Sequence, residues 1–269
     1  MRIDNSKAKL WAFCPLAYQE RYVNGLERDW SKVGTPGSMG FGSRIHQLLE
    51  QHFKAMKGES FELPPTTLGP EYEAEAQALI AGYKSFYPAE SFEVVEVERY
   101  FEVDLPGSAH RYNGKFDLVV REKESEMLCI LDHKSERRNS KDNHPEAWAA
   151  REQASRYLWA AEQIYQEPIR YLILDVLTRQ SPKGQEPPMF RRDYIERDSK
   201  QKEVSIKTLI WIADQIERMD REFGSEEWPR FSDHCKDDWK KCDFYLLHML
   251  GKDEGTLSQF KAAEEYLDL

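Results

Sequence analysis

The sequence predicts an α/β fold with a central mixed β-sheet flanked by helices, an N-terminal helical region and a C-terminal tail that contains cysteines. Three observations predict it. Helix-type spacing of apolar residues dominates the first 90 residues, alternating and β-branched runs follow, and a helical pattern then separates further strand-like runs. The order of helices, then β-β-β-α-β, then a helix is typical of a mixed sheet with helices packed around it.

The elements follow from local patterns. Helices are expected at residues 15–25, 43–56, 69–86, 146–165 and about 200–221, and a Gly-rich loop is expected at residues 34–42. Strands are expected at residues 91–105, in two arms of a hairpin within 114–138, at 170–178 and at 189–197. The run at 170–178 is almost continuously apolar, which predicts a central strand, whereas 189–197 is expected at an edge.

The bulk composition narrows the class of protein. The chain has 269 residues, of which 40% are hydrophobic and 32% charged, so it is expected to be globular and soluble. It has no apolar run long enough for a membrane span and no signal-type segment at its start, so a cytoplasmic protein without membrane contact is expected. The net charge of -10 argues against coating DNA by charge alone, but it leaves room for a local basic groove.

The hairpin within residues 114–138 brings two aspartates together. If its turn is centred between residues 124 and 125, residues whose numbers add up to 249 lie opposite each other, as Asp117 and Asp132 do. Opposed residues of antiparallel strands share a face, with Cβ atoms roughly 4.5–5.5 Å apart. Lys134 shares that face and His133 points away from it.

Two carboxylates at this distance repel each other, so one of them is expected to have a raised pKa unless a cation lies between them. Mg²⁺ and Mn²⁺ bind through one or two carboxylates, water and substrate phosphate. Asp117, Asp132 and Lys134 are therefore candidates for a site in which a metal ion activates water and an ammonium group orients it or neutralises developing charge. A surface hairpin with ordinary cross-strand Asp–Lys pairs is the structural alternative.

Further residues, in sequence order, resemble the PD-(D/E)XK nuclease superfamily, in particular its RecB-like branch with the CRISPR-adaptation exonucleases. The motifs that carry this resemblance are Cys14-Pro15-x-x-Tyr18, Gly42-x-x-x-His46, Gly114-x-x-Asp117, Asp132-His133-Lys134-Ser and Gln153-x-x-x-Tyr157. Each motif is short, and the ordered set is more specific than any one of them.

The resemblance implies a restriction-endonuclease-like core at residues 91–200, with residues 1–90 capping the site and residues 201–269 packing on the N-terminal helix, in one compact domain. It implies that metal is held by His46, Asp117, Asp132 and the backbone carbonyl of His133. It also implies a catalytic Lys134, with Gln153 and Tyr157 helping to position DNA. A hydrogen-bonded core histidine, and a helix-surface pair of Gln153 and Tyr157, are the structural alternatives.

The implied activity is hydrolysis of DNA phosphodiesters with Mg²⁺ or Mn²⁺, by an exonuclease that acts on ends or single strands. Basic residues near the site that could bind DNA are Arg137, Arg138, Lys141, Arg151 and Arg156. Tyr157 could stack on a strand. The chain lacks the G-x-x-x-x-G-K-[ST] motif of a helicase motor, so unwinding would need a recombination, helicase or CRISPR-adaptation partner.

The tail departs from the RecB-like pattern for a [4Fe-4S] cluster. Cys14 and Cys242 fit two of the four expected positions, and Cys235 and His248 are the nearest substitutes for the others. Three interpretations stay open: a cluster with a histidine ligand, a Cys₃His zinc site, or no metal and aromatic packing instead. Cys129 is expected to be a core thiol.

Two other functions are consistent with the sequence. One is a nuclease-fold protein that binds DNA or a partner without cutting. The other is an interaction module held together by metal at the tail cysteines, in which the aspartates are surface charge.

Overall fold

The computed structural model describes residues 1–29, 38–136, 151–179, 187–231 and 242–263. The chain divides into two compact units. The sheet unit comprises residues 37–103 and 113–206, and the helical unit comprises residues 1–36, 104–112 and 207–269.

The sheet unit contains most of the strands. Its elements are α4 (Ser38–Met56), α5 (Pro70–Phe86), β3 (Phe92–Asp104), β4 (Arg111–Glu122), β5 (Leu128–Glu136), α7 (Glu152–Tyr165), β6 (Ile169–Thr178) and β7 (Met189–Ile195). The strand order is β4-β5-β6-β7, and β3 pairs with β4. β4–β5 and β6–β7 are antiparallel and β5–β6 is parallel, so the prediction of a mixed sheet is confirmed.

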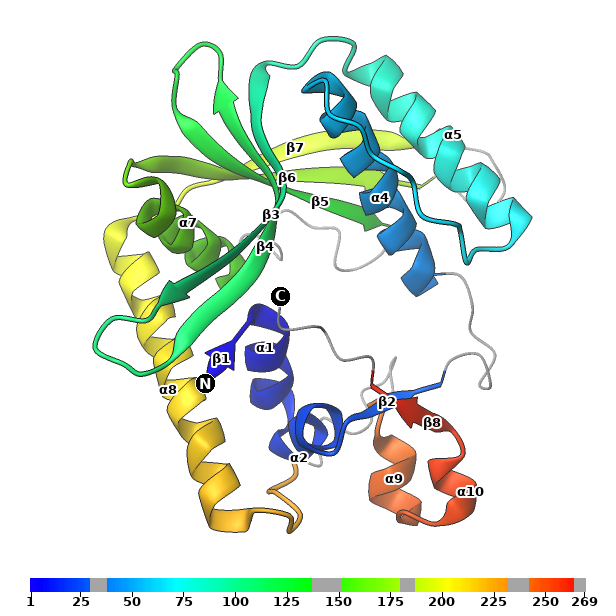
Figure 1. Ribbon diagram of the computed structural model, residues 1–269, viewed down its shortest axis with the longest axis vertical. Coiled ribbons are helices and arrows are strands. Elements are labelled where there is room, and N and C mark those ends of the chain that lie inside the picture. Colours follow the sequence, from blue (N-terminus) through cyan, green and yellow to red (C-terminus); the bar gives the residue numbers. More distant parts are fainter. Residues whose placement is uncertain (30–37, 137–150, 180–186, 232–241, 264–269) are drawn as a thin grey trace. The chain divides into compact units, whose positions relative to one another are not determined.

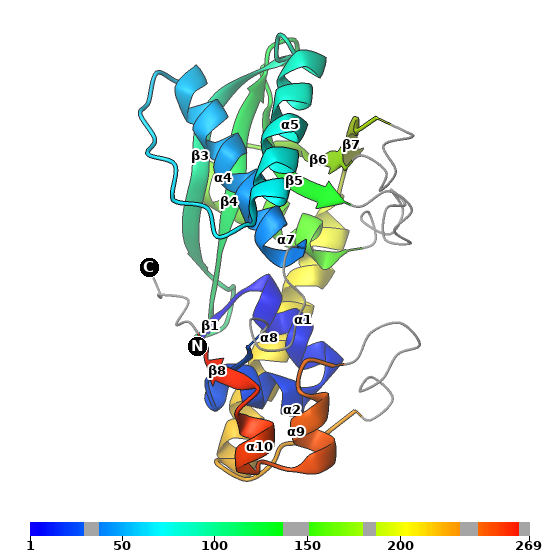
Figure 2. The same cartoon turned by 90° about the vertical axis from the view of Figure 1, so that its right-hand side faces the viewer.

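Helices flank this sheet, as predicted. Figures 1 and 2 show α4 and α5 together on one side of it, where their apolar residues share a core with alternate residues of β5 and β6, such as Leu131 and Ile173. α7 packs against β5 and β6. β6 lies between two strands and β7 lies at the edge, which confirms both expectations.

The register of the β4–β5 hairpin is the predicted one. Leu118 pairs with Leu131 and Val120 pairs with Cys129, so each pair adds up to 249. Because side chains alternate along a strand, this register determines which residues share a face with Asp117. The prediction assumed that the turn is centred between residues 124 and 125, and the observed pairs agree with that assumption.

Two predicted helix boundaries are wrong. The helix expected at residues 146–165 begins, as α7, at Glu152, because Arg151 is extended, and residues 146–150 lie outside the described residues. α4 begins at Ser38, so residues 38–42 are helical and not part of a Gly-rich loop. A Cβ atom at Gly40 would lie 3.1 Å from Leu68 Cδ2, and one at Gly42 would lie 3.5 Å from Ser135 Oγ. Gly40 therefore allows the start of the helix to approach Leu68 closely despite the low helix propensity of glycine, whereas a Cβ atom at Gly42 would make only an ordinary van der Waals contact.

The helical unit contains short elements from both ends of the chain. They are β1 (Arg2–Ile3), α1 (Asn5–Phe13), α2 (Pro15–Tyr18), the π-helix η1 (Gln19–Val23), β2 (Leu26–Arg28), most of α8 (Ser199–Phe223), α9 (Tyr245–Leu250), α10 (Glu254–Leu257) and β8 (Phe260–Ala262). β2 pairs with β8, and residues 14–17 pack against Cys242, Phe244 and Leu247. Across the described residues, no helix combines the length and the apolar character that a bilayer span requires.

Candidate active site

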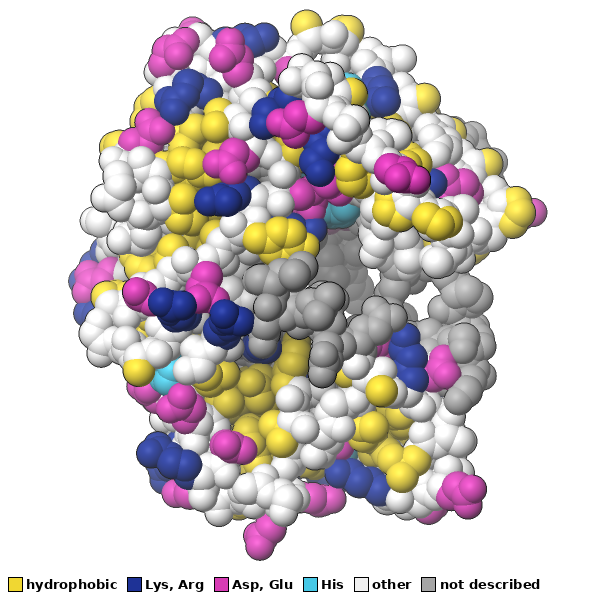
Figure 3. All heavy atoms as spheres, in the orientation of Figure 1, with side chains coloured by type: hydrophobic (Ala, Val, Ile, Leu, Met, Phe, Trp, Pro, Cys, Tyr) yellow, Lys and Arg dark blue, Asp and Glu magenta, His cyan; other side chains and the backbone are white. Residues whose placement is uncertain are grey.

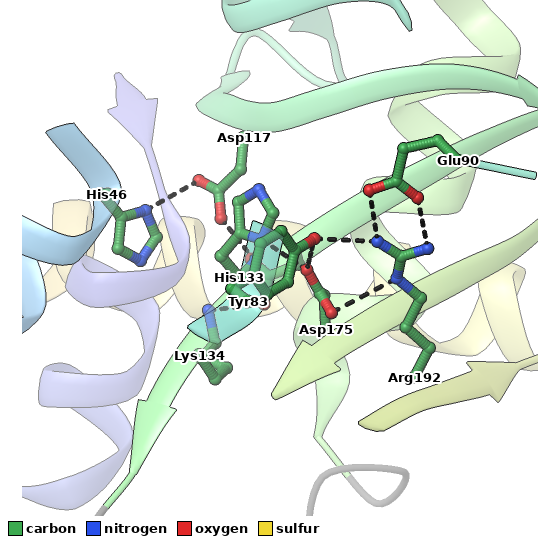
Figure 4. Close-up of polar contacts among 9 residues, drawn as sticks. His46, Tyr83, Glu90, Asp117, His133, Lys134, Asp175 and Arg192 are labelled. Carbon is green, nitrogen blue, oxygen red and sulfur yellow. Dashed lines mark hydrogen bonds and ion pairs between the residues drawn. The ribbon is translucent and has the colours of Figure 1, made fainter. Parts of the chain in front are cut away.

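Asp117 on β4 makes polar contacts with residues of two other elements, α4 and β5. Its Oδ1 lies 3.5 Å from Nδ1 of His46, which extends from α4. Its Oδ2 accepts a 2.7 Å hydrogen bond from the backbone N–H of His133 on β5. Figure 4 shows both partners around the carboxylate. The structure therefore brings together His46 and Asp117, two of the residues that the family resemblance implies as metal ligands.

Glu98 joins these two residues and was not predicted. Ligand atoms of His46, Glu98 and Asp117 all lie within 4.8 Å of one another. Glu98 lies in β3 with φ of 51°, a left-handed conformation that interrupts the regular strand, and it forms an ion pair with Lys115. Its strand contains several glutamates at alternating positions, so the sequence offers no signal that distinguishes Glu98 from the others.

Asp132 lies beside this group and has its own partners. It forms an ion pair with Lys134, and its Oδ1 accepts a 3.3 Å hydrogen bond from Nε2 of Gln153 on α7. Asp132 is 4% exposed, so these contacts lie in the interior rather than on the surface hairpin of the structural alternative. Gln153 and Lys134 thus hold the two oxygens of one carboxylate.

The pKa values of the acidic groups move in opposite directions. Burial alone would raise the pKa of Asp117, but His46 and Lys134 hold it below its ordinary value. Burial and the neighbouring charge of Asp117 raise the pKa of Asp132 and that of Glu98. One member of the aspartate pair therefore has a raised pKa, as its spacing predicted. A bound cation would relieve this repulsion.

Two basic groups respond to the same carboxylates. Burial alone would lower the pKa of Lys134, yet Asp132 and Asp117 raise it, so the ammonium stays charged. Burial likewise opposes protonation of His46, while Asp117 raises the pKa of its imidazole. A metal ion at Asp117 would compete with that proton for the histidine nitrogen.

Tyr157 lies next to the site within an aromatic group. Its ring edge contacts Phe101 and Phe116 at centroid distances of 5.9 and 5.2 Å, and Tyr157 is 8% exposed. Phe101 also lies over Gly114, where a Cβ atom would come within 2.7 Å of the ring. The aromatic group therefore fixes the start of the strand segment that carries Asp117. The DNA-positioning role of Tyr157 stays a prediction.

The basic residues proposed for DNA binding divide into two sets. Arg137, Arg138 and Lys141 lie outside the described residues. Arg151 is partly exposed at the start of α7, and Arg156 is 5% exposed, which favours an internal contact over a phosphate contact. Among the described side chains on the face in Figure 3, positive and negative groups are interspersed around the sheet unit.

The predicted tail site looks different. Cys14 and Cys242 are buried in an apolar cluster, and the ring of His248 stacks on Phe244 at a centroid distance of 6.3 Å. Among the described residues, Cys14, Cys242 and His248 do not bring three ligand atoms together. Cys235 lies outside the described residues. Cys129 is buried in the sheet-unit core, where burial raises its thiol pKa to about 11.

Comparisons with known proteins found one family model and several solved structures that resemble this chain. A family model described as the PD-(D/E)XK nuclease superfamily matches residues 5–244. A candidate exonuclease from Eubacterium rectale is 16% identical over 81% of this chain and 80% of that one, with a TM-score of 0.49. The alkaline exonuclease LHK-Exo from Laribacter hongkongensis is 16% identical over 76% of this chain and 97% of that one, with a TM-score of 0.33. Curated proteins gave no match. The family model, and not these two structures, therefore supports the assignment of this chain to a family.

Proposed function

Because this chain belongs to the PD-(D/E)XK nuclease superfamily, we propose that it is a metal-dependent deoxyribonuclease, an exonuclease that acts on DNA ends or single strands. The observation that carries the proposal is the convergence of His46, Glu98 and Asp117 beside the Asp132–Lys134 ion pair. This arrangement combines ligands for a cation with a charged amine, which together suit hydrolysis of a phosphodiester.

The donor set fits Mg²⁺ or Mn²⁺. Two carboxylates and one imidazole offer ligand atoms to a common point, and both ions accept carboxylate oxygens together with water. We propose His46, Glu98 and Asp117 as ligands, completed by Asp132 and the backbone carbonyl of His133. When bound, such an ion lowers the pKa of water and so supplies a nucleophile near neutral pH.

Lys134 and Gln153 act directly on the reactants in this proposal. The ammonium of Lys134 is charged and held by Asp132, so it can donate to the attacking water or to the phosphate oxygens on which charge develops. Gln153 fixes the other oxygen of Asp132 and presents an amide at the same point. Removing the amine therefore lowers the stabilisation of the transition state without removing the ligands of the cation.

DNA is the proposed substrate, and the basic residues Arg137, Arg138 and Arg151 are proposed to contact its backbone. With a net charge of -10, the protein would depend on such local contacts rather than on long-range attraction. A partner in recombination, unwinding or CRISPR adaptation would deliver DNA ends, in the cytoplasm. An affinity that falls steeply with salt for wild type, and less steeply after Arg151→Gln, would support this contact.

The test is digestion of labelled linear single-stranded and double-stranded DNA, circular DNA and RNA, with Mg²⁺, Mn²⁺ or EDTA. We expect metal-dependent loss of linear DNA, abolished by Asp132→Ala and by Lys134→Ala. Lys202→Ala is the matched control, because Lys202 also pairs with a carboxylate, that of Glu162, in the same unit. Digestion that persists in EDTA or in Lys134→Ala contradicts the proposal.

Other outcomes identify the alternatives. Binding of DNA without digestion would indicate a nuclease-fold protein that does not cut. Neither binding nor digestion, together with bound iron or zinc, would indicate an interaction module stabilised at Cys14, Cys235, Cys242 and His248. Metal analysis and absorption spectroscopy of the purified protein decide between a [4Fe-4S] cluster, zinc and no metal at these residues.

A further inference from the structure

A row of polar side chains crosses three neighbouring strands beside the candidate site. In the β5–β6 pairing His133 is the partner of Asp175, and in the β6–β7 pairing Asp175 is the partner of Arg192. Side chains at paired positions on neighbouring strands point to the same face. Figure 4 shows the contacts that link His133, Asp175 and Arg192, and Tyr83 from α5 also contacts Asp175.

Asp175 is the centre of this row. Its Oδ2 lies 3.0 Å from Nδ1 of His133 and accepts a 2.7 Å hydrogen bond from the hydroxyl of Tyr83. Its Oδ1 lies 3.3 Å from Nε of Arg192. Asp175 is completely buried, so these three partners hold a carboxylate from which water is excluded.

Arg192 is fixed in its turn. Its two terminal nitrogens donate to the carboxylate of Glu90 at 2.6 and 2.9 Å, and one of them also donates to the oxygen of Tyr83 at 2.8 Å. Glu90 is 8% exposed. The orientation of Asp175 is therefore determined from both sides, by a tyrosine and by an arginine that is itself held in a bidentate pair.

Stability alone is a weak reason for such a network. Replacing buried ion pairs with apolar side chains of similar volume is often neutral or stabilising. Asp175 is also the only charged residue within the strand-like run from Tyr171 to Thr178, where apolar residues would be expected. Burial of these charged groups at a central strand costs desolvation energy, so stability does not explain why the network is there.

His133 provides that reason, because it connects the network to the candidate site. Its backbone N–H donates to Asp117, its side chain contacts Asp175, and its ring stacks on Phe53 with a centroid distance of 5.5 Å. It also lies between Asp132 and Lys134 in sequence. Holding the ring of His133 therefore restrains the backbone from which both of these side chains extend.

We propose that Asp175 is a positioning residue: by holding His133, it fixes the segment from Asp132 to Lys134 relative to Asp117. This inference rests on the proposed function, because it assigns Asp175 to the same metal centre. Asp175 touches neither substrate nor metal. Its contribution is to keep the ligands and the amine in one arrangement before the ion and the DNA bind.

The first test combines Asp175→Asn, His133→Phe and the double variant. Each single change should lower kcat about 10–100-fold and weaken Mn²⁺ binding by a similar factor, as loss of residues that orient metal ligands typically does. KM for DNA should stay within about twofold, since no DNA contact is removed. Because Asp175 acts through His133, the double variant should lose no more than about twofold beyond His133→Phe.

The second test separates positioning from folding. Ile195→Ala removes a buried apolar side chain at the end of β7, outside the network, so it should lower the melting temperature while kcat and Mn²⁺ affinity stay within about 1.5-fold of wild type. If Asp175→Asn does not fold, Tyr83→Phe removes one hydrogen bond from the same oxygen of Asp175. It should give the same pattern as Asp175→Asn, with changes of about threefold.

Mn²⁺ binding, measured by calorimetry or by electron paramagnetic resonance without DNA, keeps this inference separate from the nuclease proposal. If the wild type binds Mn²⁺ but does not cut DNA, the nuclease proposal fails and the effect of Asp175→Asn on Mn²⁺ affinity still decides the inference. A lower melting temperature with unchanged Mn²⁺ affinity and kcat would overturn it, and so would losses that multiply in the double variant. A wild-type protein that binds no Mn²⁺ would overturn both.

Discussion

The sheet unit and the helical unit each contain residues of the types that bind metals, but they arrange them differently. In the sheet unit, His46, Glu98 and Asp117 converge within 4.8 Å. In the helical unit, Cys14 and Cys242 lie in an apolar cluster, and the ring nitrogens of His248 have no hydrogen-bond partner among the described residues. Both units therefore contain residues that can bind metals, and among the described residues convergence distinguishes the two groups.

The difference shows what creates a metal site. In the sheet unit the register of β4 and β5 and the docking of α4 determine where each side chain points. Cys14, Cys242 and His248 lie on short helices or next to them, not on paired strands whose register would determine where they point. Part of the tail, including Cys235, lies outside the described residues. The predictions below test this contrast, from the largest expected effect to the smallest.

The largest effect is expected for Asp117→Asn. It removes the carboxylate that contacts both His46 and His133, so kcat should fall on the order of 10³-fold, as loss of a main electrostatic group does. Cys14→Ser is the matched change in the helical unit and should leave kcat within about twofold. Initial rates on linear DNA measure both. Equal losses of kcat in the two variants would contradict the proposed difference between the two units.

Glu98→Gln should act on the metal. It replaces one carboxylate of the converging group and should weaken Mn²⁺ binding about 10–100-fold, with a melting temperature near that of wild type. Glu96→Gln, on the same strand, is the control, because Glu96 instead accepts from the hydroxyl of Tyr165. Calorimetric titration compares them. Similar Mn²⁺ affinities for the two variants would remove Glu98 from the metal centre.

Gly114→Ala should destabilise the sheet unit. Its Cβ would lie 2.7 Å from the ring of Phe101, so the ring must move, at a cost of about 1–3 kcal/mol. Gly107→Ala in the helical unit meets no atom within 4 Å but has φ of +66°, so only conformational strain of about 1 kcal/mol is expected. Urea unfolding measures both. A smaller loss at Gly114 than at Gly107 would mean that the aromatic packing is loose.

The smallest effect concerns pH. Burial and Lys84 lower the pKa of His52 on α4 to about 4. Between the unfolded value near 6.5 and about 4, the unfolded chain binds the proton and the folded one does not, so stability falls as pH falls through this window. Solvent screening of this partly exposed ring weakens the effect, so His52→Gln should reduce that fall by only about 1 kcal/mol, or about 2–4 °C in melting temperature. The melting temperatures of both proteins are measured at pH 7 and pH 5. An equal or larger fall for His52→Gln than for wild type would contradict the prediction.

The fold and half of the site could be predicted from local sequence patterns. The hairpin register followed from the assumed position of the turn, and the observed pairs have that register; Asp117 and Asp132 lie one step beyond the pair Leu118–Leu131. The prediction that β6 is central followed from its apolar run. Both conclusions depend on short-range regularities that strands display directly in sequence.

The rest depends on tertiary contacts. Glu98 itself adopts a left-handed backbone conformation within β3, and the local sequence does not indicate this conformation. The early start of α4 coincides with a close approach of Gly40 to Leu68. For Asp175 there was a signal, a single carboxylate in an apolar run, but its partners on α5 and β7 become neighbours only after folding. The roles of Gln153 and Tyr157 stay predictions.

The candidate metal-binding group draws its three members from α4, β3 and β4, which together span residues 38–122. No fragment that lacks one of these elements contains the full set. If the protein cuts DNA as proposed, a chain that has not yet folded these three elements together would be inactive.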